Sequence, residues 1–137
     1  MAAIRSKDTK PELLIRHWLF TKGYRYRLNV NYIPGHPDLF LRKYNTAIFI
    51  HGCFWHRHNG CKYAYMPKSR VDFWGKKFCA NVQGDKSVSK ELAAKGIKQL
   101  VIWECSIRKM EKSSSFMEEK FTKITEFLKS DLLYLEL

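Results

Sequence analysis

The stretch of this chain that most constrains its fold runs from residue 49 to 61 and reads FIHGCFWHRHNGC. It holds three of the chain's five histidines and two of its four cysteines, with Phe54 and Trp55 between them. Thiolate and imidazole are ligands that suit zinc, and a structural zinc site usually has four ligands. The stretch is expected to form a loop around a metal ion, and the open question is whether it serves one site or two.

The charge of the chain indicates a polyanionic partner. Twenty-five Lys and Arg against thirteen Asp and Glu give a formal net charge of +12, which favours nucleic acid. A hydrophobic content of 45% with 15% aromatic residues allows a packed core and argues against disorder. The length fits one domain, 1–137. A basic protein without a nucleic-acid partner is the alternative that charge alone leaves open.

The sequence also bears on where the protein works. No apolar run approaches the roughly 18 residues of a membrane span, and the N-terminus lacks the pattern of a signal peptide. We therefore expect a cytoplasmic, nucleoid-associated protein. Cytosolic thiols are kept reduced, so histidines interleaved with the cysteines favour metal binding over disulfides.

The first forty residues predict a helix, a strand and a loop. The helix has N-cap candidates at Asp8 and Thr9 and is expected to end at Gly23. Residues 24–27 alternate like a half-exposed strand, and the Asn, Pro and Gly content of 29–37 is typical of a loop.

A hairpin is predicted from residues 38–41 and 46–51, two apolar runs rich in strand formers. Its register decides which residue faces the carboxylate of Asp38. A two-residue turn places Asp38 opposite His51, and a three-residue turn places it opposite Ile50. In either register the carboxylate meets the start of the 49–61 stretch at a cross-strand distance of about 5 Å.

The second half of the chain predicts helices around one more strand. Residues 69–95 read as a helix that is broken near Gly84, with Asp85 as the N-cap of its second part, and that ends at Gly96. Residues 98–103 form a short buried strand.

Serines 113–115 are expected to cap a last helix, in which apolar residues repeat at three- and four-residue intervals. Strands flanked by helices at both ends predict an α/β domain with a mixed sheet.

The cysteines and one histidine suggest a single zinc site. Cys53, His58 and Cys61 have the spacing C-x4-H-x2-C, which lets one loop wrap one ion. Cys105 is the best fourth ligand because it follows the predicted strand and would tie the loop to the sheet. Cys79 lies in a helical stretch and is expected to be a small buried thiol. Four unrelated buried thiols are the alternative.

If zinc takes that set, Asp38, His51 and His56 remain at the same corner. A carboxylate binds a hard cation such as magnesium, and a histidine activates water or stabilises charge on a phosphate. A closed zinc site would then hold the loop rigid for these groups. The alternative is that both histidines are structural.

Aromatic and basic residues surround this corner. Aromatics on a rigid basic loop are able to wedge between base steps, and Phe54, Trp55 and Trp74 are candidates, although aromatics are more often core residues. The basic residues that suit phosphate contacts are Arg5, Lys7, Arg57, Lys62, Lys68, Arg70, Lys76 and Lys77.

Six ordered motifs resemble one family of nucleases. They are IRSKDTKPE (4–12), PGHPDLF (34–40), IHGCFWHRHNGC (50–61), RVDFW (70–74), KKFCANVQGD (76–85) and VIWEC (101–105). Together they resemble the very-short-patch repair DNA mismatch endonucleases. That resemblance implies a restriction-endonuclease-like fold and magnesium-dependent nicking of one strand of duplex DNA beside a T:G mismatch.

The resemblance also implies roles for single residues. Asp38 would bind magnesium together with the main-chain carbonyl of Ile50, and Glu12 would complete the acidic corner. The implied structural zinc ligands are Cys53, His58, Cys61 and Cys105.

The remaining implied roles concern proton transfer and DNA. His56 would be the general base, oriented by Asp85, and His51 would assist at the phosphate. Phe54, Trp55 and Trp74 match the aromatics inserted beside the mismatch, and Arg5, Lys7 and Arg57 are expected to contact DNA.

Three features depart from the family pattern. Ile50 stands where the pattern has threonine, which keeps a carbonyl but removes a hydroxyl. At Asn59-Gly60 the loop has one residue more before Cys61 than the family pattern has. The family usually has a basic segment ahead of the start seen here that helps to embrace DNA, and a chain without it is expected to bind DNA more weakly.

We expect a monomer that acts on T:G-mismatched duplex DNA, with other mismatch-repair proteins as further candidate partners. The rival hypotheses are a zinc-stapled DNA-binding module without catalysis, a nuclease of the same fold with another target, and a metalloenzyme that uses the zinc.

Overall fold

In a computed structural model, which describes residues 9–137, a five-stranded sheet has the order β1-β2-β3-β4-β5. The first three strands are antiparallel, and the last two run parallel to the third. The strands are β1 (Arg27–Leu28), β2 (Leu39–Leu41), β3 (Thr46–His51), β4 (Lys98–Trp103) and β5 (Tyr134–Glu136). The sheet is mixed and flanked by helices, which confirms the predicted α/β class.

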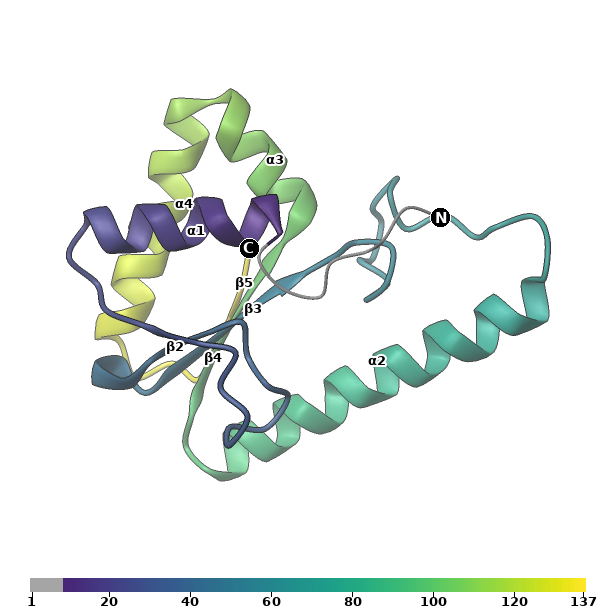
Figure 1. The fold of residues 1–137 in the computed structure, drawn as a ribbon, viewed down its shortest axis with the longest axis horizontal. Coiled ribbons are helices and arrows are strands. Elements are labelled where there is room, and N and C mark those ends of the chain that lie inside the picture. The colour runs from purple at the N-terminus through teal and green to yellow at the C-terminus, as the bar shows by residue number, and fades with distance from the viewer. Residues whose placement is uncertain (1–8) are drawn as a thin grey trace.

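Helices cover both faces of the sheet (Figure 1). One face carries α1 (Lys10–Thr21), α3 (Glu104–Lys112) and α4 (Ser114–Lys129), and the other carries α2 (Val71–Ala94). Because side chains alternate along a strand, Leu100 and Ile102 of β4 enter the first core, whereas Val101 and Trp103 enter the second. The central strands are therefore buried on both sides, as a sheet between two layers of helices requires.

The predicted capping residues lie at the observed ends of α1 and at the start of α4. The Thr9 hydroxyl accepts from the Glu12 amide at 3.4 Å, and Gly23 follows α1 at φ +91. Ser113 caps α4 by accepting from the Phe116 amide at 3.2 Å. Asp8, the other N-cap candidate, lies outside the described residues.

The hairpin register is a correction to the prediction. Leu39 pairs with Ile48, which puts Asp38 level with Phe49 and not with His51 or Ile50. The cause is a longer connection than expected, made of the 3-10 helix η1 (Arg42–Tyr44) and Asn45 in the left-handed region at φ 50. Asn residues adopt that conformation more readily than most others.

The break predicted in the second helix is also wrong. α2 runs for 24 residues through Gly84, so Asp85 is an interior helix residue and not an N-cap. A side chain at Gly84 would meet nothing within 4 Å, which places it on an open face. One glycine costs about 1 kcal/mol in a helix, and the burial of Phe78 and Leu92 on the packed face offsets this.

Two elements were not predicted. α3 begins directly after β4, and β5 pairs with β4 near the end of the chain. The strand predicted at 24–27 reduces to the two residues of β1. Among the described residues, no helix is long and apolar enough to cross a membrane.

Candidate active site and metal cluster

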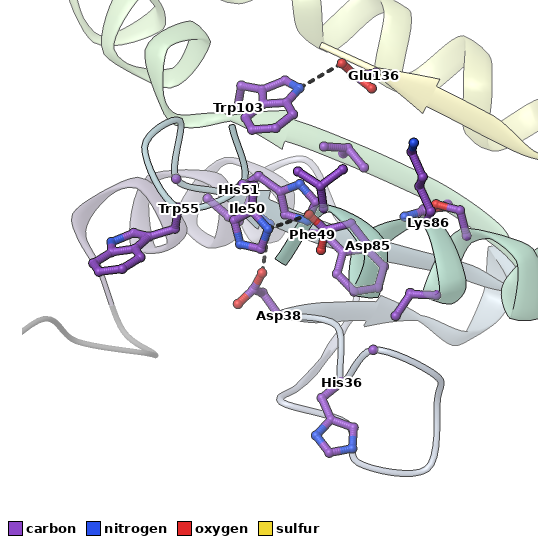
Figure 2. Close-up of a pocket in the computed structure, with 18 of the residues that line it drawn as sticks. His36, Asp38, Phe49, Ile50, His51, Trp55, Asp85, Lys86, Trp103 and Glu136 are labelled. Carbon is purple, nitrogen blue, oxygen red and sulfur yellow. Dashed lines mark hydrogen bonds and ion pairs between the residues drawn. The ribbon is translucent and has the colours of Figure 1, made fainter. Parts of the chain in front are cut away.

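A cavity of about 1160 Å³ opens beside the ends of β3 and β4, with α2 along one wall (Figure 2). Every residue predicted to take part in catalysis lines it. These residues are Glu12, Asp38, His51, His56 and Asp85. They come from α1, the residue before β2, the end of β3, the following loop and α2, so tertiary structure alone brings them together.

Asp38 is a half-buried carboxylate of this cavity. Its Oδ2 accepts a hydrogen bond from the Ile50 amide at 2.7 Å. Burial raises the pKa of Asp38 to about 6; the Ile50 hydrogen bond opposes this shift and the Glu12 carboxylate adds to it. Glu12 is only 2% exposed and pairs with Arg16. Two carboxylates held close together out of water favour a cation between them.

His56 and Asp85 form the second part of the site. Nδ1 of His56 lies 2.7 Å from Oδ2 of Asp85. The uninterrupted helix α2 holds Asp85 at this point. The contact agrees with the pairing that the family resemblance implies, although Asp85 lies inside a helix and is not an N-cap.

His51 lies against His56 as a stacked ring. The ring centroids are 3.9 Å apart and the planes differ by 6°. Burial lowers the pKa of His51 to about 4, and the neighbouring His56 adds to the effect. His51 is therefore neutral at neutral pH.

The ligand atoms of His51, His56 and Asp85 all lie within 4.8 Å of one another, which is close enough for a metal ion. The lone pair of an imidazole nitrogen lies in the plane of its ring, and two stacked, nearly parallel rings do not direct lone pairs to one point. Because Asp85 already engages Nδ1 of His56, we interpret the trio as a proton-transfer arrangement.

A second cluster, on the other side of the loop, joins three thiols and one imidazole. The ligand atoms of Cys53, His58, Cys61 and Cys105 all lie within 4.8 Å of one another. Nδ1 of His58 is 3.6 Å from the Cys53 sulfur and 3.3 Å from the Cys105 sulfur. Cys79 is exposed on α2, so its prediction as a buried thiol is wrong.

The extra residue of the loop is absorbed by a turn. The Cys61 amide donates to the His58 carbonyl at 3.2 Å, and Gly60 adopts φ +72 inside the turn. Asn59 and Gly60 are exposed, so the longer spacing still returns Cys61 to the cluster.

The thiols of this cluster fit a divalent cation. Burial raises the pKa of Cys53 to about 12, and burial also raises the pKa of Cys105. Buried thiolates without a counter-charge are unfavourable, and a soft dication supplies that charge. Three sulfurs and one imidazole nitrogen are a donor set that suits zinc.

One indole separates the two clusters. The His58 ring stacks on Trp103 with centroids 4.2 Å apart, and His51 meets the same indole edge-on at 5.2 Å. Nε1 of Trp103 donates to Glu136 at 2.9 Å. Sequence reasoning did not single out Trp103 or Glu136: the motif VIWEC contained the first, but Glu136 lies on the unpredicted β5.

The three candidate wedge aromatics lie in one cluster. The Phe54 ring is 5.1 Å from Trp55 and 5.5 Å from Trp74, and the two indoles are 5.8 Å apart. All three are half-buried, with Phe78 beneath them. Asn81 of α2 donates to the Trp55 carbonyl at 2.9 Å.

The basic residues predicted to contact DNA differ in their surroundings. The guanidinium of Arg57 donates to carbonyls of its own loop. Arg5 and Lys7 lie outside the described residues. Of the other basic candidates, Lys62, Lys68, Arg70, Lys76 and Lys77 are all exposed.

These features define an α/β protein with a carboxylate and a His–Asp pair in one cavity, beside a Cys3His cluster of the structural-metal type. The sequence model of a family described as DNA mismatch endonuclease Vsr matches residues 1–62. The DNA mismatch endonuclease Vsr of Escherichia coli K12 is 37% identical over 112 residues, 82% of this chain and 71% of that protein.

Two further relatives are named as nicking enzymes. The type II nicking enzyme V.NmeAIP of Neisseria meningitidis serogroup A is 41% identical over 129 residues, 94% of this chain and 89% of that enzyme. The type II nicking enzyme V.XorIIP of Xanthomonas oryzae is 42% identical over 107 residues, 78% of each chain. The chain belongs to the DNA mismatch endonuclease Vsr family.

Proposed function

We propose that this protein is a DNA endonuclease that nicks one strand of duplex DNA beside a T:G mismatch and requires magnesium. Membership of the Vsr family and the nicking activity in its relatives' names support the reaction. The observation that carries the proposal is the cavity in which Asp38 faces the His56–Asp85 pair.

Asp38 and the main-chain carbonyl of Ile50 would hold the magnesium, with Glu12 completing the acidic corner. Oxygen donors suit this hard cation, and a main-chain carbonyl is available whatever the side chain, so isoleucine in place of threonine preserves it. The cation would polarise the phosphate and the attacking water.

His56 would be the general base. When Nδ1–H of His56 donates to Asp85, the other ring nitrogen Nε2 carries the lone pair and accepts a proton from water. Asp85 fixes this tautomer and stabilises the imidazolium that forms. His51, being neutral, adds no positive charge beside that imidazolium and is able to donate a hydrogen bond to the phosphate.

The Cys3His cluster would hold a structural zinc. With four protein ligands it leaves no open position for chemistry, so its role is to keep His56 and the aromatic cluster in place. Phe54, Trp55 and Trp74 would insert beside the mismatch, while the net charge of +12 supports contacts with the phosphates.

We also infer that the mixed sheet belongs to the restriction-endonuclease-like fold, and that residues 1–137 act as one endonuclease domain. Supporting this, the cavity lies beside the ends of β3 and β4, interior strands that both cores share, and Asp38 directly precedes β2.

The test is a nicking assay on two duplexes that differ only in a T:G or T:A pair. Magnesium should give a single-strand nick in the T:G duplex, and EDTA should abolish it. Asp38→Ala should lose nicking and keep DNA binding. Equal cleavage of both duplexes would contradict mismatch specificity, and binding without cleavage by the wild type would favour the zinc-stapled binding module.

A further inference from the structure

Arg57 lies in the loop between the candidate base His56 and the zinc-ligand candidate His58, and its side chain turns into the protein. Nη1 donates to the carbonyls of Phe54 and Tyr65 at 3.2 and 3.1 Å. Nη2 donates to the carbonyl of Ala64 at 2.7 Å. One guanidinium thus joins the beginning of the loop to its end.

The same guanidinium lies over the aromatic cluster. Its central carbon is 3.9 Å from the centre of the Phe78 ring and 5.7 Å from that of Phe54. Phe78 is 4% exposed and belongs to α2. Arg57 therefore clamps the loop against the helix that also carries Trp74 and Asp85.

The backbone of Arg57 is also unusual. It adopts φ +55, in the left-handed region that residues other than glycine rarely occupy. Surrounding contacts must hold a residue there, and the three hydrogen bonds and two ring contacts of the side chain do so. The kink directs His56 toward the cavity and His58 toward the thiols.

From these contacts we infer that Arg57 is a positioning residue for mismatch recognition and not a phosphate contact. It holds Phe54, and through Phe54 the cluster with Trp55 and Trp74, in the arrangement that meets the mismatched pair. This inference rests on the proposed function.

The chemistry of the side chain requires arginine. A guanidinium offers donors in a planar fork and a face that stacks on aromatic rings, whereas a lysine ammonium is a compact point charge. Lysine at this position keeps the charge but does not serve three carbonyls while lying flat on Phe78. A phosphate contact, in contrast, survives the change to lysine.

The deciding variant is Arg57→Lys, with Arg25→Lys as the matched control because Arg25 is an exposed arginine whose guanidinium lies over the Phe20 ring, outside the site. Single-turnover nicking of the T:G duplex should fall roughly ten- to a hundredfold in Arg57→Lys, and the preference for T:G over T:A should fall with it. The salt dependence of DNA binding should match that of the wild type. Arg25→Lys should keep the nicking rate at saturating protein.

A second variant extends the test, and a second measurement makes it independent of the nicking reaction. Phe78→Leu removes the ring beneath the guanidinium and should also lower the T:G preference. Near-ultraviolet circular dichroism of Arg57→Lys should change in the tryptophan region while bound zinc is retained, and it should do so even if the wild type proves not to nick DNA.

The opposite pattern would overturn the inference. In that pattern Arg57→Lys nicks T:G duplexes and discriminates like the wild type, while Arg57→Ala lowers the slope of log affinity against log salt by about 0.9, the value for one phosphate contact. An unchanged tryptophan signal in Arg57→Lys would also overturn it.

Discussion

The Cys3His cluster and the Asp38 cavity lie on either side of one indole, and both contain buried acidic groups that favour a cation. In the cluster, burial raises the pKa of Cys53 to about 12, and in the cavity it raises the pKa of Asp38 to about 6. The donor atoms differ: soft sulfur and nitrogen in one, hard oxygen in the other. A set of four protein ligands suits structural support, whereas the oxygen donors line a cavity that has room for a substrate.

The largest expected effect is that of Asp38→Asn. Nicking should fall by on the order of a thousandfold or more, because the metal-holding charge is lost. Without magnesium, the variant should be more stable than the wild type, because the cost of burying the carboxylate disappears. The difference between a pKa of about 6 and the ordinary 3.8 corresponds to at most about 3 kcal/mol.

Urea unfolding of both proteins in EDTA at neutral pH measures this gain. A lower stability of Asp38→Asn under those conditions would contradict an energetic cost of desolvating the Asp38 carboxylate.

Next in size is the loss of the cluster. Cys105→Ser should lose bound zinc, lower the midpoint of thermal unfolding and abolish most nicking, because metal binding contributes folding free energy. Cys79→Ser is the matched control, since Cys79 is an exposed thiol outside the cluster, and it should keep its zinc and its activity.

Metal analysis of the purified proteins decides this prediction. If Cys105→Ser and Cys79→Ser retain the same amount of zinc, then Cys105 is not a ligand.

A smaller effect is the decrease of the nicking rate at acidic pH, the acid limb of the pH–rate profile. As pH falls through about 6, Asp38 takes up a proton and loses the charge proposed to hold magnesium, so the rate should drop about tenfold per pH unit below that point. Magnesium favours the ionised carboxylate, so higher magnesium should move the midpoint to lower pH. A midpoint that ignores magnesium would assign the limb to another group.

The same pKa shift has the opposite sign for stability. The folded-state pKa of Asp38 lies above its ordinary value, so the protonated form is the one that folding favours. This contribution is fully present below about pH 4 and is lost as the pH rises through about 6.

The smallest expected effect concerns α2, which forms one wall of the cavity and carries Asp85. Gly84→Ala should raise stability by about 0.5–1 kcal/mol, because alanine favours the helix and a Cβ there meets nothing within 4 Å. Nicking should not change. Gly35→Ala is the contrast: its Cβ would lie 2.6 Å from Val88 at φ +82, so it should destabilise. Thermal unfolding distinguishes the two variants. A destabilising Gly84→Ala would favour the helix break near Gly84 that the sequence predicts.

Much of the site follows from local spacing. Cys53, His58 and Cys61 lie within nine residues of one another, so one loop is sufficient to bring them together. The preference of zinc for four ligands that include thiolates distinguishes this set from His51 and His56. The capping serine of α4 and the buried run of β4 are similarly local signals.

The errors have non-local causes. The hairpin register depended on a 3-10 turn that composition did not reveal, and α2 continues through Gly84 because its other face is packed. Residue type alone marked Arg57 as a phosphate contact; in the structure its hydrogen-bond partners are carbonyls of its own loop.

The donor atoms, the sign of the charge and most of the helices and strands are predictable from the sequence, because they depend on residue type and short spacings. Which groups share a cavity depends on the fold, which brings Glu12, Asp38 and Asp85 together from separate elements and places Trp103 between the two sites. Burial and neighbouring charges, which shift pKa values, exist only once the chain has folded. The same holds for the acceptors that engage the hydrogen-bond donors of a side chain.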